Sequence, residues 1–176
     1  DAGKTTFRTE MYADYKGGRA KTPDEFREQF PFIRELLDHL GIRHYELAQY
    51  EADDIIGTLG RLAEKDSFEV TIVSGDKDLI QLTDEHTVVM GGELCREMRI
   101  SFTPEYLMEK MGITPTQFID LKALMGDKSD NIPGVTKIGE KTGIKLLLEH
   151  GSLEGIYENI DGMKASKMKE NLINDK

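Results

Sequence analysis

The sequence of 176 residues predicts an α/β fold, formed as one domain or as one domain with a small appended module. Two observations predict this class. Short segments with β-strand patterns, at 42–47, 70–74, 87–90 and 98–101, alternate with longer segments whose apolar residues recur at helical spacing. The segment 70–74 is a β-branched run followed by a Gly-Asp loop, which is typical of a buried parallel strand.

The first predicted helix begins at Thr22-Pro23, with Thr22 as its cap, and ends at Gly41. Pro31 lies inside this pattern and should kink the helix or split it in two. The segment 42–47 then alternates between apolar and polar residues and indicates a short strand. The apolar residues of the helix are expected to be core: Phe26, Phe30, Ile33, Leu36, Leu37 and Leu40.

Further helices follow along the chain. One is predicted from residue 51 to about 65, burying Ile55, Ile56, Leu59 and Leu62. Others begin at Thr103-Pro104 and at Thr114-Pro115, and the second of these should bury Phe118, Ile119, Leu121 and Leu124. A helix with the apolar face Ile144, Leu146, Leu147 and Leu148 precedes two short helices, at about 152–160 and 164–172, with a basic run at Lys164, Lys167 and Lys169.

The composition limits the classes of function. A formal net charge of −10 argues at first sight against a nucleic-acid partner, because phosphate binding usually shows as a basic surface. Eight of the acids are candidate metal ligands, however, so the distribution of charge matters more than its total. Cys95 is the only cysteine, which excludes an intrachain disulfide and favours a reducing cytoplasm. No apolar run of about 18 residues occurs, so no membrane span is expected.

Three carboxylates lie within four residues at Glu51, Asp53 and Asp54. Carboxylates this close repel one another unless a cation lies among them, and Mg²⁺ takes oxygen ligands of this type. They fall in the first turn of the predicted helix, where acids also occur as ordinary caps. Capping needs only one acid, so the group of three favours a metal site.

Two further pairs of acids follow predicted elements. Asp76 and Asp78 come after the strand 70–74, at the edge of the sheet where α/β proteins bind ligands. Turns also favour Gly and Asp for local reasons, but two independent acid clusters at strand ends are harder to explain in that way. Asp127 and Asp130 are three residues apart and should lie on one side of a helical turn.

Two segments suit phosphate groups. In residues 1–22, basic side chains outnumber acids and are interleaved with Phe7, Tyr12 and Tyr15, which fits a surface that holds phosphates and stacks bases. A solvated entry loop is the alternative. In residues 132–142, Gly134 and Gly139 flank a tight turn between two helices, so backbone N–H groups could approach a phosphate. A plain helix-to-helix turn is the alternative.

Carboxylates that hold divalent cations, combined with phosphate-binding segments, predict metal-dependent hydrolysis of phosphodiesters. No cysteine, histidine or serine arrangement competes as a nucleophilic site. A non-catalytic DNA-binding module, or a stand-alone relative with an incomplete metal site, is an alternative. A small-molecule phosphohydrolase with an aspartyl nucleophile in Asp76-Lys77-Asp78 is another, but it leaves the basic segment and the glycine turn without a role.

Four motifs in order resemble those of the bacterial 5′-nuclease family: Tyr50 to Gly57, Ser74 to Leu79, Leu124 to Gly134 and Ile138 to Thr142. The resemblance covers essentially the whole chain and is strongest to the 5′→3′ exonuclease domains of bacterial DNA polymerases. It implies a mixed, mainly parallel sheet flanked by helices, of the PIN or 5′-nuclease type, with a helix-hairpin-helix module.

The resemblance also implies a function and partners. It implies hydrolysis of DNA at 5′ ends, flaps or nicks with Mg²⁺ or Mn²⁺, through two ions, in replication and repair. The protein would be a cytoplasmic monomer without membrane contact, and a polymerase domain would follow. The catalytic core would span 1–102, with an arch region at about 4–40, and the helical DNA-binding part would span 103–176.

Individual residues are assigned by the same resemblance. The expected metal ligands, which are also catalytic, are Asp1, Glu51, Asp53, Asp54, Asp76, Asp78, Asp127 and Asp130. Lys16 and Arg19 are expected to be catalytic as well as DNA-binding. The other expected DNA contacts are Lys4, Arg8 and Tyr15 in the arch region, and Gly134, Val135, Lys137, Ile138, Gly139, Lys141 and Thr142 in the hairpin, where several relatives also hold K⁺.

One feature of the family is missing from the sequence. Family members begin with a strand that carries a further Asp, ahead of the position of Asp1. We therefore expect the chain to be a piece of a longer protein, to lack one metal ligand, and to be inactive by itself or to form only part of the folded protein.

Overall fold

The computed structural model describes residues 5–91 and 100–176. The chain divides into two compact units. The first contains residues 1–55 and 129–131, and the second contains residues 56–128 and 132–176. Within the described residues, no helix combines the length and the apolar character needed to cross a bilayer.

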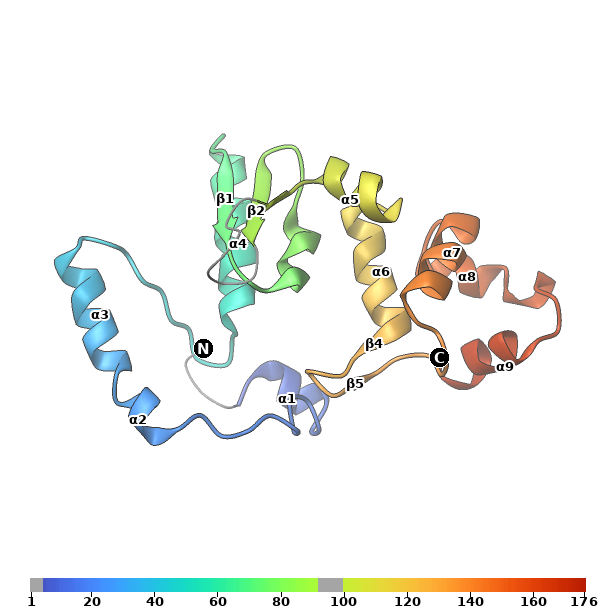
Figure 1. The fold of residues 1–176 in the computed structure, drawn as a ribbon, viewed down its shortest axis with the longest axis horizontal. Helices are drawn as coiled ribbons and strands as arrows, with labels where there is room; N and C mark the ends of the chain where they lie inside the picture. Colours follow the sequence, from blue (N-terminus) through green and yellow to red (C-terminus); the bar gives the residue numbers. More distant parts are fainter. Residues whose placement is uncertain (1–4, 92–99) are drawn as a thin grey trace. The chain divides into compact units, whose positions relative to one another are not determined.

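The first unit contains the helices α1 (Phe7–Met11), α2 (Asp24–Arg27) and α3 (Phe30–His39) (Figure 1). The helix predicted from 22 to 41 is therefore split in two, as expected from Pro31. Pro31 lies in the first turn of α3, where its missing N–H removes no intrahelical hydrogen bond. The predicted cap was wrong by one residue, because Pro23 and not Thr22 precedes the first helical residue of α2.

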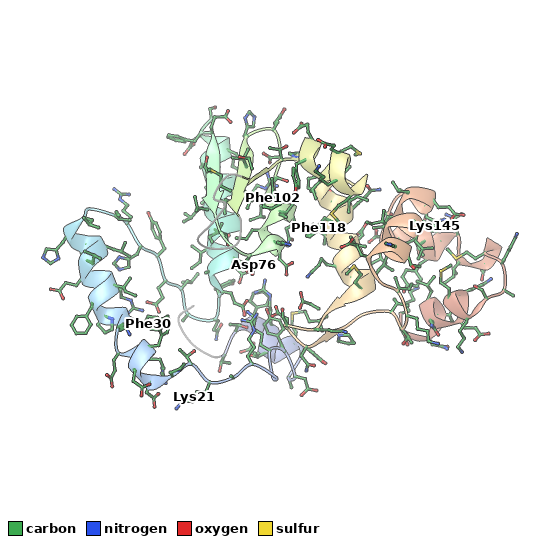
Figure 2. The ribbon with its side chains drawn as sticks, viewed as in Figure 1. Lys21, Phe30, Asp76, Phe102, Phe118 and Lys145 are labelled. Atoms are coloured by element: carbon green, nitrogen blue, oxygen red, sulfur yellow. The ribbon has the colours of Figure 1, made fainter. Side chains whose placement is uncertain are left out.

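Two predictions for the first unit were wrong. No residue of α3 is buried, although its apolar residues were expected to be core; Phe30, labelled in Figure 2, is 42% exposed. Residues 42–47 form no strand. The two errors have one physical reason. Amphipathic patterns record which face a segment can bury, but a strand forms only beside a hydrogen-bonding partner and a helix buries its stripe only against a packed neighbour.

The helix α4 (Ala52–Lys65) confirms the prediction for 51–65 and begins in the first unit before it continues in the second. Asp53 and Asp54 lie in its first turn, as expected. Ile56 packs against the small core of the sheet. Leu59 and Leu62 are exposed, contrary to prediction.

The second unit contains a mixed sheet with the strand order β1 (Val70–Val73), β2 (Thr87–Gly91) and β3 (Ile100–Phe102). β1 and β2 are parallel, with Val70 opposite Thr87, and β2 and β3 are antiparallel, with Val89 opposite Phe102. The parallel strand predicted at 70–74 is confirmed, although Val73 is exposed. Of the segment predicted at 98–101, residues 98 and 99 lie outside the described residues.

A short 3₁₀ helix, η1 (Lys77–Leu82), connects β1 to β2. Its Leu79 is buried with Ile72 and Val89 in the small core of the sheet. Its Ile80 is buried in the larger helical core. The segment that follows β1 is therefore held by packing on both sides.

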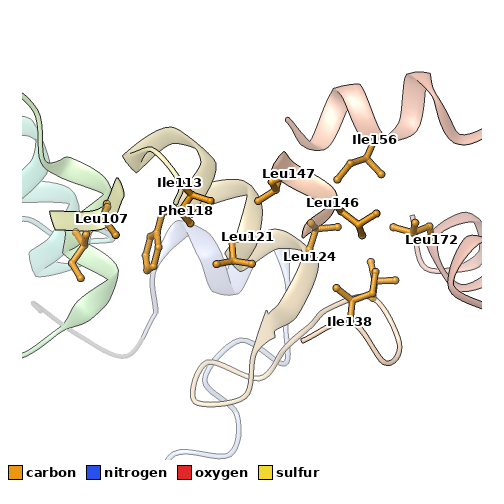
Figure 3. Close-up of a cluster of buried hydrophobic side chains, with 12 residues drawn as sticks. Leu107, Ile113, Phe118, Leu121, Leu124, Ile138, Leu146, Leu147, Ile156 and Leu172 are labelled. Atoms are coloured by element: carbon orange, nitrogen blue, oxygen red, sulfur yellow. The ribbon is translucent and has the colours of Figure 1, made fainter. Parts of the chain in front are cut away.

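The second unit also contains several helices: α5 (Pro104–Met111), α6 (Pro115–Met125), α7 (Glu140–His150), α8 (Leu153–Glu158), η2 (Ile160–Gly162) and α9 (Lys167–Asn174). The predicted helix starts at Thr103-Pro104 and Thr114-Pro115 are confirmed. Thr103 caps α5 by accepting from the Tyr106 N–H, and Thr114 caps α6 by accepting from the Gln117 N–H. Leu121, Leu124 and Leu147 are almost completely buried in the core shown in Figure 3. Ile119 and Leu148, which were expected to face that core, are exposed.

A two-residue ladder joins β4 (Gly126–Asp127) to β5 (Ile132–Pro133). Gly126 ends α6 with a φ of +70°, a backbone conformation that glycine adopts without strain. A Cβ on Gly134 would lie 2.1 Å from the Met125 carbonyl carbon, so the two segments approach more closely than a side chain allows. Asp127 and Asp130 therefore lie on a hairpin and not on a helical turn, which corrects that prediction.

Candidate active site

The first group of predicted site residues is centred on Tyr15. Its side chain is buried, and its hydroxyl lies 3.1 Å from Glu51 Oε2 and 3.2 Å from Asp130 Oδ2. Burial, followed by the charges of Glu51 and Asp130, raises the pKa of the Tyr15 hydroxyl well above its ordinary value. The hydroxyl therefore stays protonated, and its one proton is shared between the two carboxylates.

A basic side chain from the predicted arch region pairs with each of three carboxylates in the first unit, those of Glu51, Asp54 and Asp130. The Arg8 guanidinium donates two hydrogen bonds of 2.7 Å, one to each carboxylate oxygen of Asp54. Lys16 Nζ lies 2.7 Å from Glu51 Oε2, and an Arg19 nitrogen lies 2.5 Å from Asp130 Oδ1. The hydrogen bonds from Arg8 hold the pKa of Asp54 below its ordinary value. Three carboxylates are thus balanced by three cations of the same unit.

The local backbone holds these side chains in place. The Lys16 N–H donates to the Asp130 carbonyl at 2.8 Å, and Asn131 Nδ2 donates to the Asp14 carbonyl at 2.9 Å. Lys16 has a φ of 56°, an uncommon conformation for a residue with a side chain. These bonds join the turn at Lys16 to residues 129–131, so segments more than 110 positions apart in the sequence form one site.

Asp54 also acts as a helix cap. Its Oδ2 accepts from the Glu51 N–H at 2.9 Å, immediately before α4 begins. The capping alternative therefore applies to Asp54. The Glu51 side chain is buried, and its carboxylate contacts Tyr15 and Lys16. Asp53 lies on the exposed side of the same turn.

The second group of predicted residues lies in the second unit, at the end of β1. Asp76, labelled in Figure 2, caps η1 by accepting from the Asp78 N–H at 2.9 Å. Asp78 and Asp127 both contact the ammonium of Lys122, at 2.9 Å and 2.5 Å. Burial alone would lower the pKa of Lys122, but the hydrogen bonds that its ammonium donates to Asp127 and Asp78 outweigh this effect and raise the pKa.

Lys122 is the functional candidate that the sequence analysis missed. It lies in the last turn of α6, where a basic residue is explained by the helix dipole alone. Its position five residues before Asp127 was the available signal, since a long side chain in the last turn can reach an acid just beyond the helix.

The chemistry of these oxygen donors fits a hard divalent cation such as Mg²⁺. Glu51, Asp54 and Asp130 belong to the first unit, and Asp76, Asp78 and Asp127 belong to the second. Among the residues that the structure describes, no three acidic, histidine or cysteine side chains gather closely enough to hold a metal. Asp1 and Lys4 lie outside the described residues. The assignment of metal ligands therefore stays a prediction.

The predicted phosphate-binding hairpin lies between β5 and α7. Val135 and Ile138 are buried in the helical core, so only their backbone groups could contact DNA. Lys137 and Lys141 are exposed, and Thr142 is half-buried. Gly139 is the N-cap of α7, and a Cβ there would meet nothing within 4 Å, so its surroundings are open.

The C-terminal helix α9 supports this hairpin. Asn171 Nδ2 donates to the Thr136 carbonyl at 2.7 Å, and the Thr136 N–H donates to Asp175 Oδ2 at 2.8 Å. Both contacts lie on the side of the turn before Gly139. They hold the turn without using the N-terminus of α7.

The mixed sheet, the carboxylates at the end of β1 and the glycine turn before α7 agree with the motifs found in the sequence. The chain belongs to the 5′-3′ exonuclease family: residues 1–112 match its N-terminal resolvase-like domain and residues 113–176 match its C-terminal SAM fold. This result confirms the family that the four motifs indicated.

The comparisons with individual proteins agree. The chain is 86% identical, over all of its 176 residues, to DNA polymerase I of Streptococcus pneumoniae strain R6, of which it covers 20%. It thus spans about a fifth of the length of the curated relatives that it matches. T5 5′-exonuclease with bound zinc has a similar structure, with a TM-score of 0.83 and 28% identity over 99% of this chain and 67% of that one.

A T5 D15 flap endonuclease in a pseudo-enzyme-product complex with DNA and metal ions is also similar. Its TM-score is 0.81 at 26% identity, over 99% of this chain and 67% of that one. These structures confirm the α/β fold class of the 5′-nuclease type. They do not assign functional roles to individual residues of this chain.

Proposed function

We propose that this chain is a structure-specific 5′ nuclease that hydrolyses DNA at 5′ ends and flaps with divalent cations. The observation that carries the proposal is the pairing of acids and bases at the site. Arg8, Lys16 and Arg19 each contact a carboxylate of the predicted metal set, so groups suited to a cation and groups suited to a phosphate lie together.

The proposed cations are two Mg²⁺ or Mn²⁺ ions, held by Asp1, Glu51, Asp53, Asp54, Asp76, Asp78, Asp127 and Asp130. When bound, they supply a polarised water and stabilise negative charge on the leaving oxygen. The likeness to nucleases with bound metal ions supports a divalent cation. The identity and number of the ions belong to the proposal.

The chain's own residues have separate roles in this proposal. Tyr15 holds the buried Glu51 and the Asp130 carboxylate at one point through a single hydroxyl. Arg8, Lys16 and Arg19 neutralise the carboxylates when no substrate is present and turn to the phosphates of the DNA strand when it arrives. Arg19, the most exposed of the three, makes the first contact, because its side chain is already half in solvent.

The duplex would be held through the hairpin after β5. The open surroundings of Gly139 and the N-terminus of α7 suit a phosphate that approaches the backbone, with Lys137 and Lys141 nearby in sequence. The same hairpin is the proposed place of a K⁺ ion. We assign the catalytic core to 1–102, with its arch region at about 4–40, and DNA binding by helices to 103–176.

The identity with DNA polymerase I over 20% of its length supports a place for this chain at the 5′ nuclease end of a longer polymerase. Such a protein would act in the cytoplasm, as a monomer, in replication and repair, where 5′ ends are removed ahead of synthesis. The alternative is a module that binds branched DNA without cutting it.

The test uses a 5′-flap duplex with Mg²⁺, on the 176-residue chain and on the full-length polymerase. Cleavage by the full-length protein should fall about 100-fold or more in Asp76→Ala plus Asp78→Ala, because several kcal/mol of transition-state stabilisation is lost. Asp24→Ala plus Asp38→Ala, which removes two exposed acids, is the matched control. Undiminished cleavage in the first double variant would refute the proposal, and binding without any cleavage would favour the DNA-binding module.

A further inference from the structure

Lys122 lies at the point where two candidate metal ligands meet. Its Nζ is 2.9 Å from Asp78 Oδ1 and 2.5 Å from Asp127 Oδ2. The Asp127 side chain is 15% exposed and that of Lys122 is 32% exposed, so the contact is partly screened from water. The ammonium therefore occupies a position between two carboxylates from separate segments.

The fold holds Lys122 in this position through contacts made by the residues before and after it in the sequence. Its neighbour in sequence, Leu121, is buried in the same core as Ile80 of η1, which places the end of α6 beside the segment that carries Asp78. Asp127 follows α6 directly and is held by the ladder with β5. Two carboxylates held in this way repel each other unless positive charge lies between them.

The contact differs from the other ion pairs of the candidate site. Arg8 holds the two oxygens of one carboxylate, and Lys16 and Arg19 each contact one member of the metal set. Lys122 alone among these four cations bridges two of the predicted ligands. Carboxylate oxygens of this kind are also the ligands that would hold a divalent cation.

We propose that Lys122 is a positioning residue that acts as a built-in counter-ion: it holds Asp78 and Asp127 together without metal and is displaced by a divalent cation. This inference rests on the proposed function, because it needs Asp78 and Asp127 to be metal ligands. Displacement follows from charge, since an ammonium and a divalent cation that share two carboxylates repel each other strongly. Lys122 has a flexible four-carbon stem, which allows its charge to swing into solvent.

The test measures Mn²⁺ binding to the full 176-residue chain by electron paramagnetic resonance, so it needs no substrate and no turnover. Lys122→Met should bind Mn²⁺ about tenfold more tightly, because a competing positive charge is gone. Lys122→Arg, which keeps the charge, should bind like the unaltered chain. Lys110→Met is the matched control, since Lys110 pairs with Glu109, an acid outside the predicted metal set.

The following results would contradict the inference about Lys122. If Lys122→Met binds Mn²⁺ as the unaltered chain does, or more weakly, Lys122 is not a competitor and the inference is wrong, while the proposed function stands. If neither chain binds Mn²⁺ and the full-length protein leaves flap DNA intact, the proposed function fails and the inference fails with it.

A second measurement uses the unaltered chain, so it does not depend on whether a variant folds. Acetylation of lysines is followed by mass spectrometry with and without saturating Mn²⁺. Lys122 should react faster with Mn²⁺ present, because its ammonium has been released to solvent. Lys169, which donates to the Asp161 and Met163 carbonyls, should react at the same rate in both conditions. An unchanged rate at Lys122 overturns the inference.

Discussion

The hydroxyl of Tyr15 lies 3.1 Å from Glu51 Oε2, and the Tyr15 side chain and Glu51 are both more than 90% buried. A neutral donor beside a buried carboxylate replaces the water that this carboxylate would otherwise bind. The same hydroxyl lies 3.2 Å from Asp130 Oδ2, so one group serves two acids that come from opposite halves of the sequence. Tyr15 therefore joins two of the predicted acids within the first unit.

Replacing Tyr15 with Phe should destabilise the chain by about 1–2 kcal/mol, because two carboxylates lose a donor and one of them is buried. Urea-induced unfolding followed by circular dichroism measures the change. Tyr12→Phe is the control, since Tyr12 is exposed and should change stability by less than about 0.5 kcal/mol. Equal effects of the two substitutions would show that the hydroxyl of Tyr15 has no special role.

Acid should remove the stabilisation that Asp84 supplies to the second unit. Burial alone would raise the pKa of Asp84, but the His86 N–H, Arg61 and the Thr87 N–H outweigh it and lower the pKa below 3.8. A group with a lowered pKa stabilises the folded state above its unfolded pKa, and this contribution disappears as the pH falls through the folded value.

The stability difference between the unaltered chain and Asp84→Asn should therefore be present at pH 7 and shrink below about pH 3.8. Urea-induced unfolding of the two proteins, at pH 7 and at an acidic pH below that threshold, measures this stability difference. Asp66→Asn, at an exposed acid just beyond α4, controls for a general loss of negative charge. A difference that grows in acid would have the wrong sign for this explanation.

Two adjacent leucines of α7 should respond very differently to truncation. Leu147 is completely buried in the helical core, whereas its neighbour Leu148 is exposed. Leu147→Ala should cost about 2–5 kcal/mol through lost burial and a residual cavity. Leu148→Ala should change stability by less than about 0.5 kcal/mol. Thermal unfolding of the two variants decides between this orientation of α7 and the one predicted from the sequence, in which both leucines are core.

Substitutions of Gly134 and Gly139, which flank the predicted phosphate-binding turn between β5 and α7, should separate folding from DNA binding. Gly139→Ala should leave the fold intact, because a Cβ there meets nothing within 4 Å, but it should weaken binding to flap DNA by blocking the approach of a phosphate. Fluorescence anisotropy at fixed salt measures the affinity. Gly134→Ala should instead destabilise the chain, because its Cβ would overlap the backbone of Met125. Unchanged affinity in Gly139→Ala would argue against the hairpin as a phosphate site.

Much of the architecture was predictable, because it depends on local chemistry. Thr103-Pro104 and Thr114-Pro115 specify helix starts through a cap and a fixed φ, and both were found where expected. The position of Pro31 predicted the break before α3. The parallel strand at 70–73 followed from its β-branched run.

Other features depend on which segments meet, and the sequence pattern does not contain that information. The alternation in 42–47 and the apolar stripe of α3 each describe a face that could be buried, but both are exposed here. Leu148 and Ile119 were placed on the wrong side of their helices for the same reason. The spacing of Asp127 and Asp130 suggested a helical turn, whereas Gly126 and Gly134 pack so closely that a hairpin forms instead.

The sequence by itself determined the family, the order of the main elements and the set of candidate carboxylates, because these depend on residue types and spacing along the chain. Only the tertiary structure decided the pairing of charges: Arg8 with Asp54, Lys16 with Glu51, Arg19 with Asp130, and Lys122 with both Asp78 and Asp127. Most of these partners are tens of residues apart or more. Ion pairs of this kind form only after packing brings distant segments within a few ångströms, because Coulomb attraction weakens with distance and is screened by solvent and salt.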